Sequence, residues 1–93
     1  MIKDVHEARK HINRIDMLII TALAERMSLM PHIGLYKQER KIPIFDEKRE
    51  VEIMGKLKKV AKEHNLDEGF VEEIFLSIFN EAKRIQNEVV SKS

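Results

Sequence analysis

The sequence predicts an all-α protein in which three helices, the first of them long, form one domain over residues 1–93. Apolar residues recur at intervals of three and four through most of the chain, which is the period of a helix packed on one side. No segment alternates apolar and polar residues over several positions, so strands are not expected. Only three glycines and two prolines interrupt the chain, and no repeat or linker divides it.

The first helix is expected from about Asp4 to about Glu39. Its apolar stripe is formed by Val5, Ala8, Ile12, Ile15, Ile19 and Ala22, and Ile33 continues it. Pro31 removes a backbone donor within this range and Gly34 weakens the helix further. We therefore expect a kink at the proline, in preference to two separate helices.

Two shorter helices are expected to follow. Pro43 disfavours helix at Ile42, which predicts a loop over residues 40–45. Asp46 is placed to cap a second helix that runs to about His64, and Asp67 to cap a third that reaches the carboxyl end. The third helix carries one amide on its apolar face, which comprises Val71, Ile74, Phe75, Ile78, Phe79, Ala82, Ile85 and Gln86.

The length of the first helix predicts a homodimer. About 36 helical residues span roughly 54 Å, whereas a compact domain of this size is only ~30 Å across. The first helix would therefore extend beyond its own domain with its apolar stripe exposed. Burying that stripe against a second copy of the chain is the simplest remedy.

The composition argues against several classes of protein. Seventeen basic and 16 acidic residues are interleaved to a net charge of +1, and no basic recognition face is present, which disfavours nucleic-acid binding. The longest apolar run, residues 17–24, is too short for a membrane span, and the charged amino terminus is unlike a signal peptide. The absence of cysteine fits a cytoplasmic protein. His6 and His11 lie ~140° apart on a helix, so no metal site is expected.

Two cations lie where the first helix should be apolar. Arg26 and Lys37 are eleven residues apart, which places them within about 20° of each other around the helix. Burying them without partners is costly, so they must meet carboxylates or an anionic ligand. Arg9 points roughly 100° away from Arg26 and could serve the same kind of site in the partner of a dimer.

Further polar residues accompany these cations on the other helices. Asp46, Arg49 and Glu50 share one face at the beginning of the second helix, and Gln86 requires a partner on the third. Together with Arg26 and Lys37, they predict a cationic pocket with a carboxylate and an amide as orienting groups. The alternative is that the two cations reach solvent, or pair with Glu50 and Asp46 in a purely structural role.

In the order and spacing of these residues the chain resembles the all-helical (AroQ-class, type II) chorismate mutases, from about Ala8 to Gln86. The matching strings are Arg9-x-x-Ile12-x-x-Ile15-Asp16, Leu23-x-x-Arg26, Ile33-Gly34-x-Tyr36-Lys37, Pro43-Ile44-x-Asp46-x-x-Arg49-Glu50, Leu66-Asp67-x-x-Phe70-Val71, Ile74-Phe75 and Gln86. Each string alone is weak, and their combination is specific.

The resemblance implies an intertwined homodimer that converts chorismate to prephenate by a Claisen rearrangement, with no metal and no cofactor. The implied active site combines Arg9 of one subunit with Arg26, Lys37, Asp46, Arg49, Glu50 and Gln86 of the other. In this implied site Arg9 and Arg26 bind the two substrate carboxylates, with Arg49 nearby as a supporting charge. Lys37 and Gln86 donate to the ether oxygen, and Glu50 with Asp46 holds the ring hydroxyl.

Two positions depart from the family pattern. Ala82 stands where many members have a serine that helps to bind a carboxylate, and Pro31 falls between Arg26 and Lys37. The alternatives are an isochorismate-pyruvate lyase of the same fold and a non-catalytic helical dimer with a regulatory role. Association with another enzyme of the shikimate pathway stays open.

Overall fold

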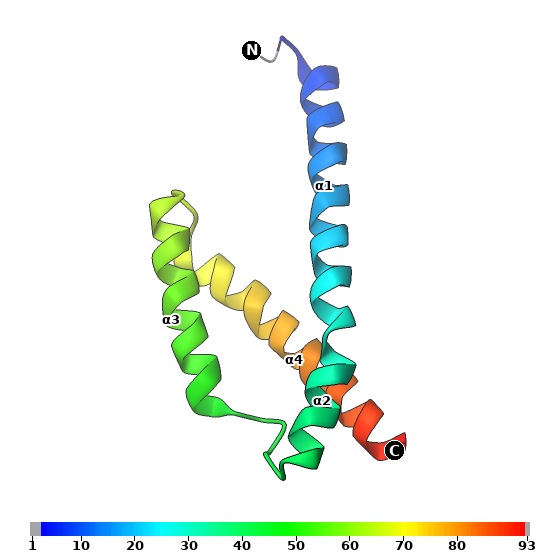
Figure 1. Ribbon diagram of the computed structural model, residues 1–93. Coiled ribbons are helices and arrows are strands. Elements are labelled where there is room, and N and C mark those ends of the chain that lie inside the picture. Colours follow the sequence, from blue (N-terminus) through cyan, green and yellow to red (C-terminus); the bar gives the residue numbers. More distant parts are fainter. Residues whose placement is uncertain (1–2, 93) are drawn as a thin grey trace.

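The computed structural model describes residues 3–92, which form four helical segments (Figure 1). These are α1 (Val5–Ser28), α2 (Met30–Glu39), α3 (Glu47–Glu63) and α4 (Glu68–Lys92). Only Leu29 separates α1 from α2, so the two together are the predicted first helix. The prediction of an all-α fold with three helices and a long first one is confirmed.

The interruption of the long helix lies at Leu29, two residues before Pro31. The proline has no N–H to donate to the carbonyl of Met27, and its ring crowds the preceding turn. The Leu29 N–H accordingly donates to the Arg26 carbonyl at 3.3 Å, one residue short of the α-helical spacing. Helical bonding resumes at once, because the Ile33 N–H donates to the Leu29 carbonyl at 3.1 Å. The proline therefore interrupts the helical hydrogen bonding at one residue, and the bonding continues on both sides of it.

Aspartates cap three of the helices. The carboxylates of Asp4, Asp46 and Asp67 each accept a hydrogen bond from the backbone N–H three residues later, at 2.9, 3.0 and 2.8 Å. Each bond satisfies a donor that the first turn of a helix leaves unpaired. The caps at Asp46 and Asp67 are those that the sequence predicts.

Helix α4 is the centre of the packed part of the molecule. Both α2 and α3 pack against it, whereas α1 touches only α2 and α4 (Figure 1). The buried apolar residues of the described chain all come from these three helices and are Met30, Met54, Ala61, Val71, Phe79 and Ala82. This core is small for a chain of 93 residues.

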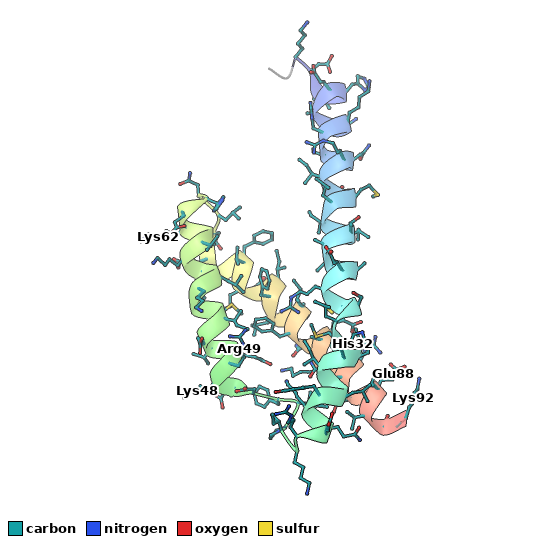
Figure 2. The ribbon with its side chains drawn as sticks, viewed as in Figure 1. His32, Lys48, Arg49, Lys62, Glu88 and Lys92 are labelled. Carbon is teal, nitrogen blue, oxygen red and sulfur yellow. The ribbon has the colours of Figure 1, made fainter. Side chains whose placement is uncertain are left out.

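Helix α1 extends away from this core, as its length predicts. It contains no buried residue, and Figure 2 shows its side chains standing out along the whole helix. The molecule is 55 Å long with a radius of gyration of 16.8 Å, against ~12 Å for a compact domain of this length. Its accessible surface of 7597 Å² exceeds by roughly 2,000 Å² the surface of a typical monomer of this mass.

Gly34 allows α2 to approach α4 closely. A Cβ atom at this position would lie 3.1 Å from both the Cα and the carbonyl oxygen of Gln86, and 3.3 Å from its Cβ. Two of these three neighbours are backbone atoms, which cannot move without shifting the helix. The absence of a side chain at Gly34 therefore sets the distance between α2 and α4.

We expect Gly34→Ala to lower the free energy of unfolding by about 1–3 kcal/mol, because the added methyl forces the two helices apart. Gly55→Ala in α3 is the matched control, since nothing lies within 4 Å of its Cβ position. It should instead raise stability by about 0.5–1 kcal/mol, the ordinary gain from alanine in a helix. Urea unfolding at one protein concentration measures both, and equal effects would contradict the proposed close contact.

Candidate active site

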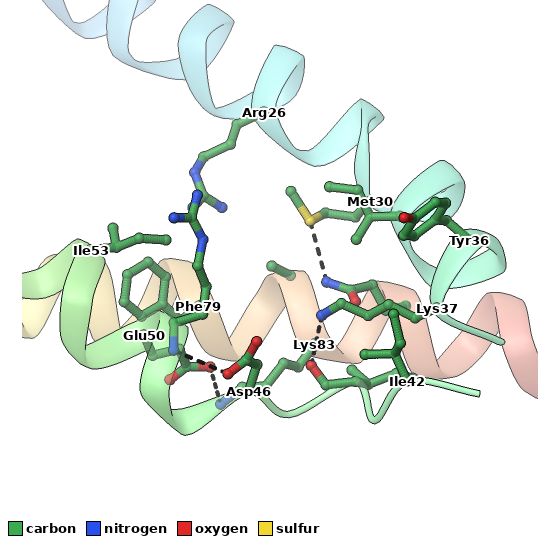
Figure 3. A pocket seen from close by; sticks show the side chains of 15 residues that line it. Arg26, Met30, Tyr36, Lys37, Ile42, Asp46, Glu50, Ile53, Phe79 and Lys83 are labelled. Carbon is green, nitrogen blue, oxygen red and sulfur yellow. Dashed lines mark hydrogen bonds and ion pairs between the residues drawn. The ribbon is translucent and has the colours of Figure 1, made fainter. Parts of the chain in front are cut away.

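A cavity of about 500 Å³ lies where the end of α1, α2, the beginning of α3 and α4 meet. Six of the seven residues that the sequence singles out line it: Arg26, Lys37, Asp46, Arg49, Glu50 and Gln86. Figure 3 shows Arg26 entering from α1 on one side, with Asp46 and Glu50 on the opposite side. Residues separated by up to 60 positions in the sequence are thus gathered around one space.

Arg26 lies against the aromatic floor of the cavity. Its guanidinium carbon is 5.7 Å from the centre of the Phe79 ring, a distance at which the ring face attracts a cation. Its Nη1 atom is buried and makes no hydrogen bond within the described residues. A buried guanidinium nitrogen in this state is costly, and a carboxylate would satisfy it with two parallel hydrogen bonds.

Lys37 is held in place by the loop that follows α2. Its Nζ donates to the carbonyl of Ile44 at 2.9 Å. The chain reverses at Lys41, whose φ of 57° is left-handed, and the Ile42 N–H donates back to the Lys37 carbonyl at 2.8 Å. An ammonium has three donors, so two remain for a bound molecule.

Gln86 is a buried amide with incomplete hydrogen bonding. Only 5% of its surface is exposed. Its Nε2 lies 3.5 Å from the sulfur of Met30, a weak acceptor, and its Oε1 is buried without a hydrogen-bond partner within the described residues. Buried amides are normally paired, so this one indicates a site for a ligand.

The beginning of α3 supplies the acidic side of the cavity. The Asp46 carboxylate is engaged in capping α3, and the Glu50 carboxylate forms an ion pair with Lys83 at 2.9 Å. Arg49 also lines the cavity, but its guanidinium lies 3.8 Å from Glu52 and both side chains are more than half exposed. Such a pair is weak and leaves Arg49 able to reorient.

Arg9 is the one predicted residue that does not line the cavity. It is exposed on α1, 17 residues before Arg26, which corresponds to about 26 Å along the helix. Within one chain Arg9 and Arg26 therefore do not line the same site.

Lys83 is a cavity residue that the sequence analysis did not single out. It lies on α4 between Phe79 and Gln86, four and three residues away, and so shares their face. That spacing was available in the sequence, but a lysine beside an apolar stripe most often reaches solvent. The pairing with Glu50 depends on how α3 and α4 approach each other, which the sequence does not reveal.

The charges of the cavity suit a small dianion. Four cations, Arg26, Lys37, Arg49 and Lys83, face two carboxylates, which leaves a net charge of +2. The lining includes no serine, cysteine or histidine, the residues that most often act as nucleophiles or proton carriers. The arrangement can bind, orient and polarise an anionic molecule.

Residues 3–92 contain neither a metal-binding cluster nor a membrane-spanning helix. No group of three or more His, Asp or Glu side chains is arranged there to hold a metal ion. None of the four helices is long and apolar enough to cross a membrane.

Comparison with known proteins identifies the family. Residues 8–87 match the family "Chorismate mutase type II". A chorismate mutase of Methanocaldococcus jannaschii is 36% identical over the whole chain and 94% of its own length. A bifunctional chorismate mutase/prephenate dehydratase of Buchnera aphidicola is 32% identical over 96% of this chain, which spans 23% of that protein. A 4-amino-4-deoxychorismate mutase of Streptomyces pristinaespiralis is 22% identical over 89% of this chain and 64% of its own length. The chain therefore belongs to the type II chorismate mutase family.

Proposed function

We propose that this protein is a chorismate mutase, an isomerase of aromatic amino-acid biosynthesis that rearranges chorismate to prephenate. The observation that carries the proposal is the meeting of Arg26, Lys37 and Gln86, from three helices, in one cationic cavity. Membership of the family and the full-length similarity to an archaeal chorismate mutase support it. The lyase and regulatory alternatives gain no support from these relatives.

The reaction explains why the cavity needs no nucleophile. Chorismate rearranges in one unimolecular step, in which the bond from the ether oxygen to the ring breaks while a carbon–carbon bond forms. The enzyme has to hold the flexible enolpyruvyl arm over the ring. Arg26 binds one substrate carboxylate and Arg9 of a second subunit binds the other, with Arg49 as a supporting charge. Fixing this geometry can lower the activation barrier by several kcal/mol.

The second contribution is electrostatic. Negative charge develops on the ether oxygen as its bond to the ring breaks, and Lys37 and Gln86 donate hydrogen bonds to it. Both are already oriented, one by the Ile44 carbonyl and the other by burial beside Met30. Donors fixed in advance in this way contribute about 3–4 kcal/mol each to lowering the barrier.

Glu50, with Asp46, accepts the hydrogen bond of the ring hydroxyl. Ala82 is buried in the wall of the cavity, at the position where many members carry a serine. Substrate binding here therefore lacks that hydroxyl contact and depends more on the cations.

Relatives that join this activity to prephenate dehydratase in one chain support an association with the enzyme that consumes prephenate.

The first test is turnover of chorismate by the purified protein, followed by loss of its absorbance and identification of the product. We expect prephenate, formed with saturation kinetics. Release of pyruvate from isochorismate, without prephenate from chorismate, would favour the lyase. A folded protein that acts on neither compound would favour the regulatory role.

A homodimer completes the proposed site. The apolar residues of α1 are exposed, among them Ile12, Ile15 and Ile19 at 52%, 43% and 52%. The excess surface of roughly 2,000 Å² matches the area that stable homodimers bury. Pairing α1 with its copy in the partner would cover the stripe and carry Arg9 across the interface.

Mixing two inactive variants tests this sharing. We expect Arg9→Ala and Arg26→Ala each to lose activity about a hundredfold or more, because each removes a carboxylate contact. When they are unfolded together and refolded, random pairing gives half heterodimers, each with one intact site, so about a quarter of wild-type activity should return. Each variant refolded alone is the control. Heterodimers proven by mass spectrometry that stay inactive would contradict a shared site.

Replacing the buried amide separates function from stability. We expect Gln86→Leu to lower kcat by about 10²–10³-fold, since a donor to the ether oxygen is lost. The free energy of unfolding should stay the same or rise by about 1 kcal/mol, because an unpaired buried oxygen is removed. Asn80→Leu, on the exposed side of α4, is the control and should leave kcat unchanged. A destabilised Gln86→Leu variant with normal kcat would assign the amide a structural role.

A further inference from the structure

The role of Lys83 is not explained by the proposed mechanism. Its Nζ lies 2.9 Å from Oε2 of Glu50, and both side chains are only 23% exposed. The ammonium also lies 4.5 Å from the centre of the Phe45 ring, in the loop between α2 and α3. Lys83 is thus fixed from two sides at the wall of the cavity (Figure 3).

The partner of Lys83 is the carboxylate assigned above to the ring hydroxyl. A carboxylate has two oxygens and about four acceptor sites, so Glu50 can accept from a hydroxyl while it is paired. Its negative charge, however, is balanced by the ammonium of Lys83. A neutral hydroxyl needs only an acceptor oxygen of Glu50. A cationic donor bound to the same oxygen would lie close to the ammonium of Lys83.

This arrangement bears on two compounds that differ at one ring position. Chorismate carries a hydroxyl there, and 4-amino-4-deoxychorismate, named in the Streptomyces relative, carries an amine. An aliphatic amine of this kind is protonated at neutral pH. With Lys83 included, the lining of the cavity carries a net charge of +2, which disfavours a further cation beside a carboxylate that is already paired.

We propose that Lys83 is a specificity-determining residue, which by neutralising Glu50 selects the ring hydroxyl over the ring ammonium. The proposal rests on the proposed function, because it assumes that the ring substituent lies at Glu50. Lys83 itself takes no part in the bonds that break and form in the reaction.

The test compares the two compounds as substrates of the wild type and of Lys83→Met. Loss of the ammonium lowers the attraction for the carboxylates of both compounds equally, so this effect cancels in the ratio of their kcat/KM values. We expect the ratio of amine to hydroxyl compound to rise about tenfold, the size of one removed charge–charge contact near a protein surface. Lys83→Arg should restore the wild-type ratio, because it keeps the charge.

The chain offers a matched control in Lys58. It forms an ion pair with Glu72 at 2.9 Å, also between α3 and α4, but neither residue lines the cavity. Lys58→Met should leave the ratio unchanged. Glu50→Gln is the complementary variant: it leaves Lys83 without its counter-charge, so the ratio should fall below that of the wild type.

The ratio of calorimetric dissociation constants for the two compounds measures the discrimination in binding without turnover. A wild type that binds chorismate but does not rearrange it would refute the proposed function and still allow the ratio to be read. An unchanged ratio in both Lys83→Met and Glu50→Gln would overturn the role of Lys83. An equal change in Lys58→Met would do so as well, because it would show a general effect of loosening α3 from α4.

Discussion

The close approach of α2 to α4 at Gly34 is the constraint on which the cavity depends. Because a Cβ at this position would meet the backbone of Gln86 at 3.1 Å, the two helices can lie this near only at a glycine. One turn beyond Gly34, Lys37 then reaches the same space as Gln86. A wider separation would move the ammonium away from the amide, and the two could not donate together to one oxygen as we propose. The spacing of these two groups in the cavity is thus set by a residue that has no side chain.

Much of the fold could be predicted because its signals are local. The caps at Asp46 and Asp67 and the helical period act within a few residues, and both were found where expected. The sequence predicts a kink in the first helix at Pro31, and the interruption lies at Leu29, because a proline disturbs the turn before it. The shift is small, and Arg26 and Lys37 still line one cavity.

The site was predictable only in part, for a physical reason. Arg26, Lys37 and Gln86 are conspicuous because they are polar residues on apolar stripes, where burial is costly. Lys83 gives no such signal, because its place in the site depends on an ion pair with Glu50 on another helix. Contacts between helices depend on their distance and rotation, and these depend in turn on features such as Gly34. Local sequence patterns therefore identify polar residues on apolar stripes, such as Arg26 and Gln86. They do not identify a residue such as Lys83, whose ion pair forms between two helices.

Two buried polar atoms that lower the stability of the fold also belong to the proposed active site. Nη1 of Arg26 and Oε1 of Gln86 are both buried without a hydrogen bond within the described residues, and both border the cavity. In a core this small, such groups are a considerable loss of stability. The dianion that we propose as substrate would satisfy the guanidinium, and the proposed dimer would add the burial that α1 lacks. Substrate and a second subunit that bind the folded chain in this way would each stabilise it, so the proposal couples folding, assembly and substrate binding.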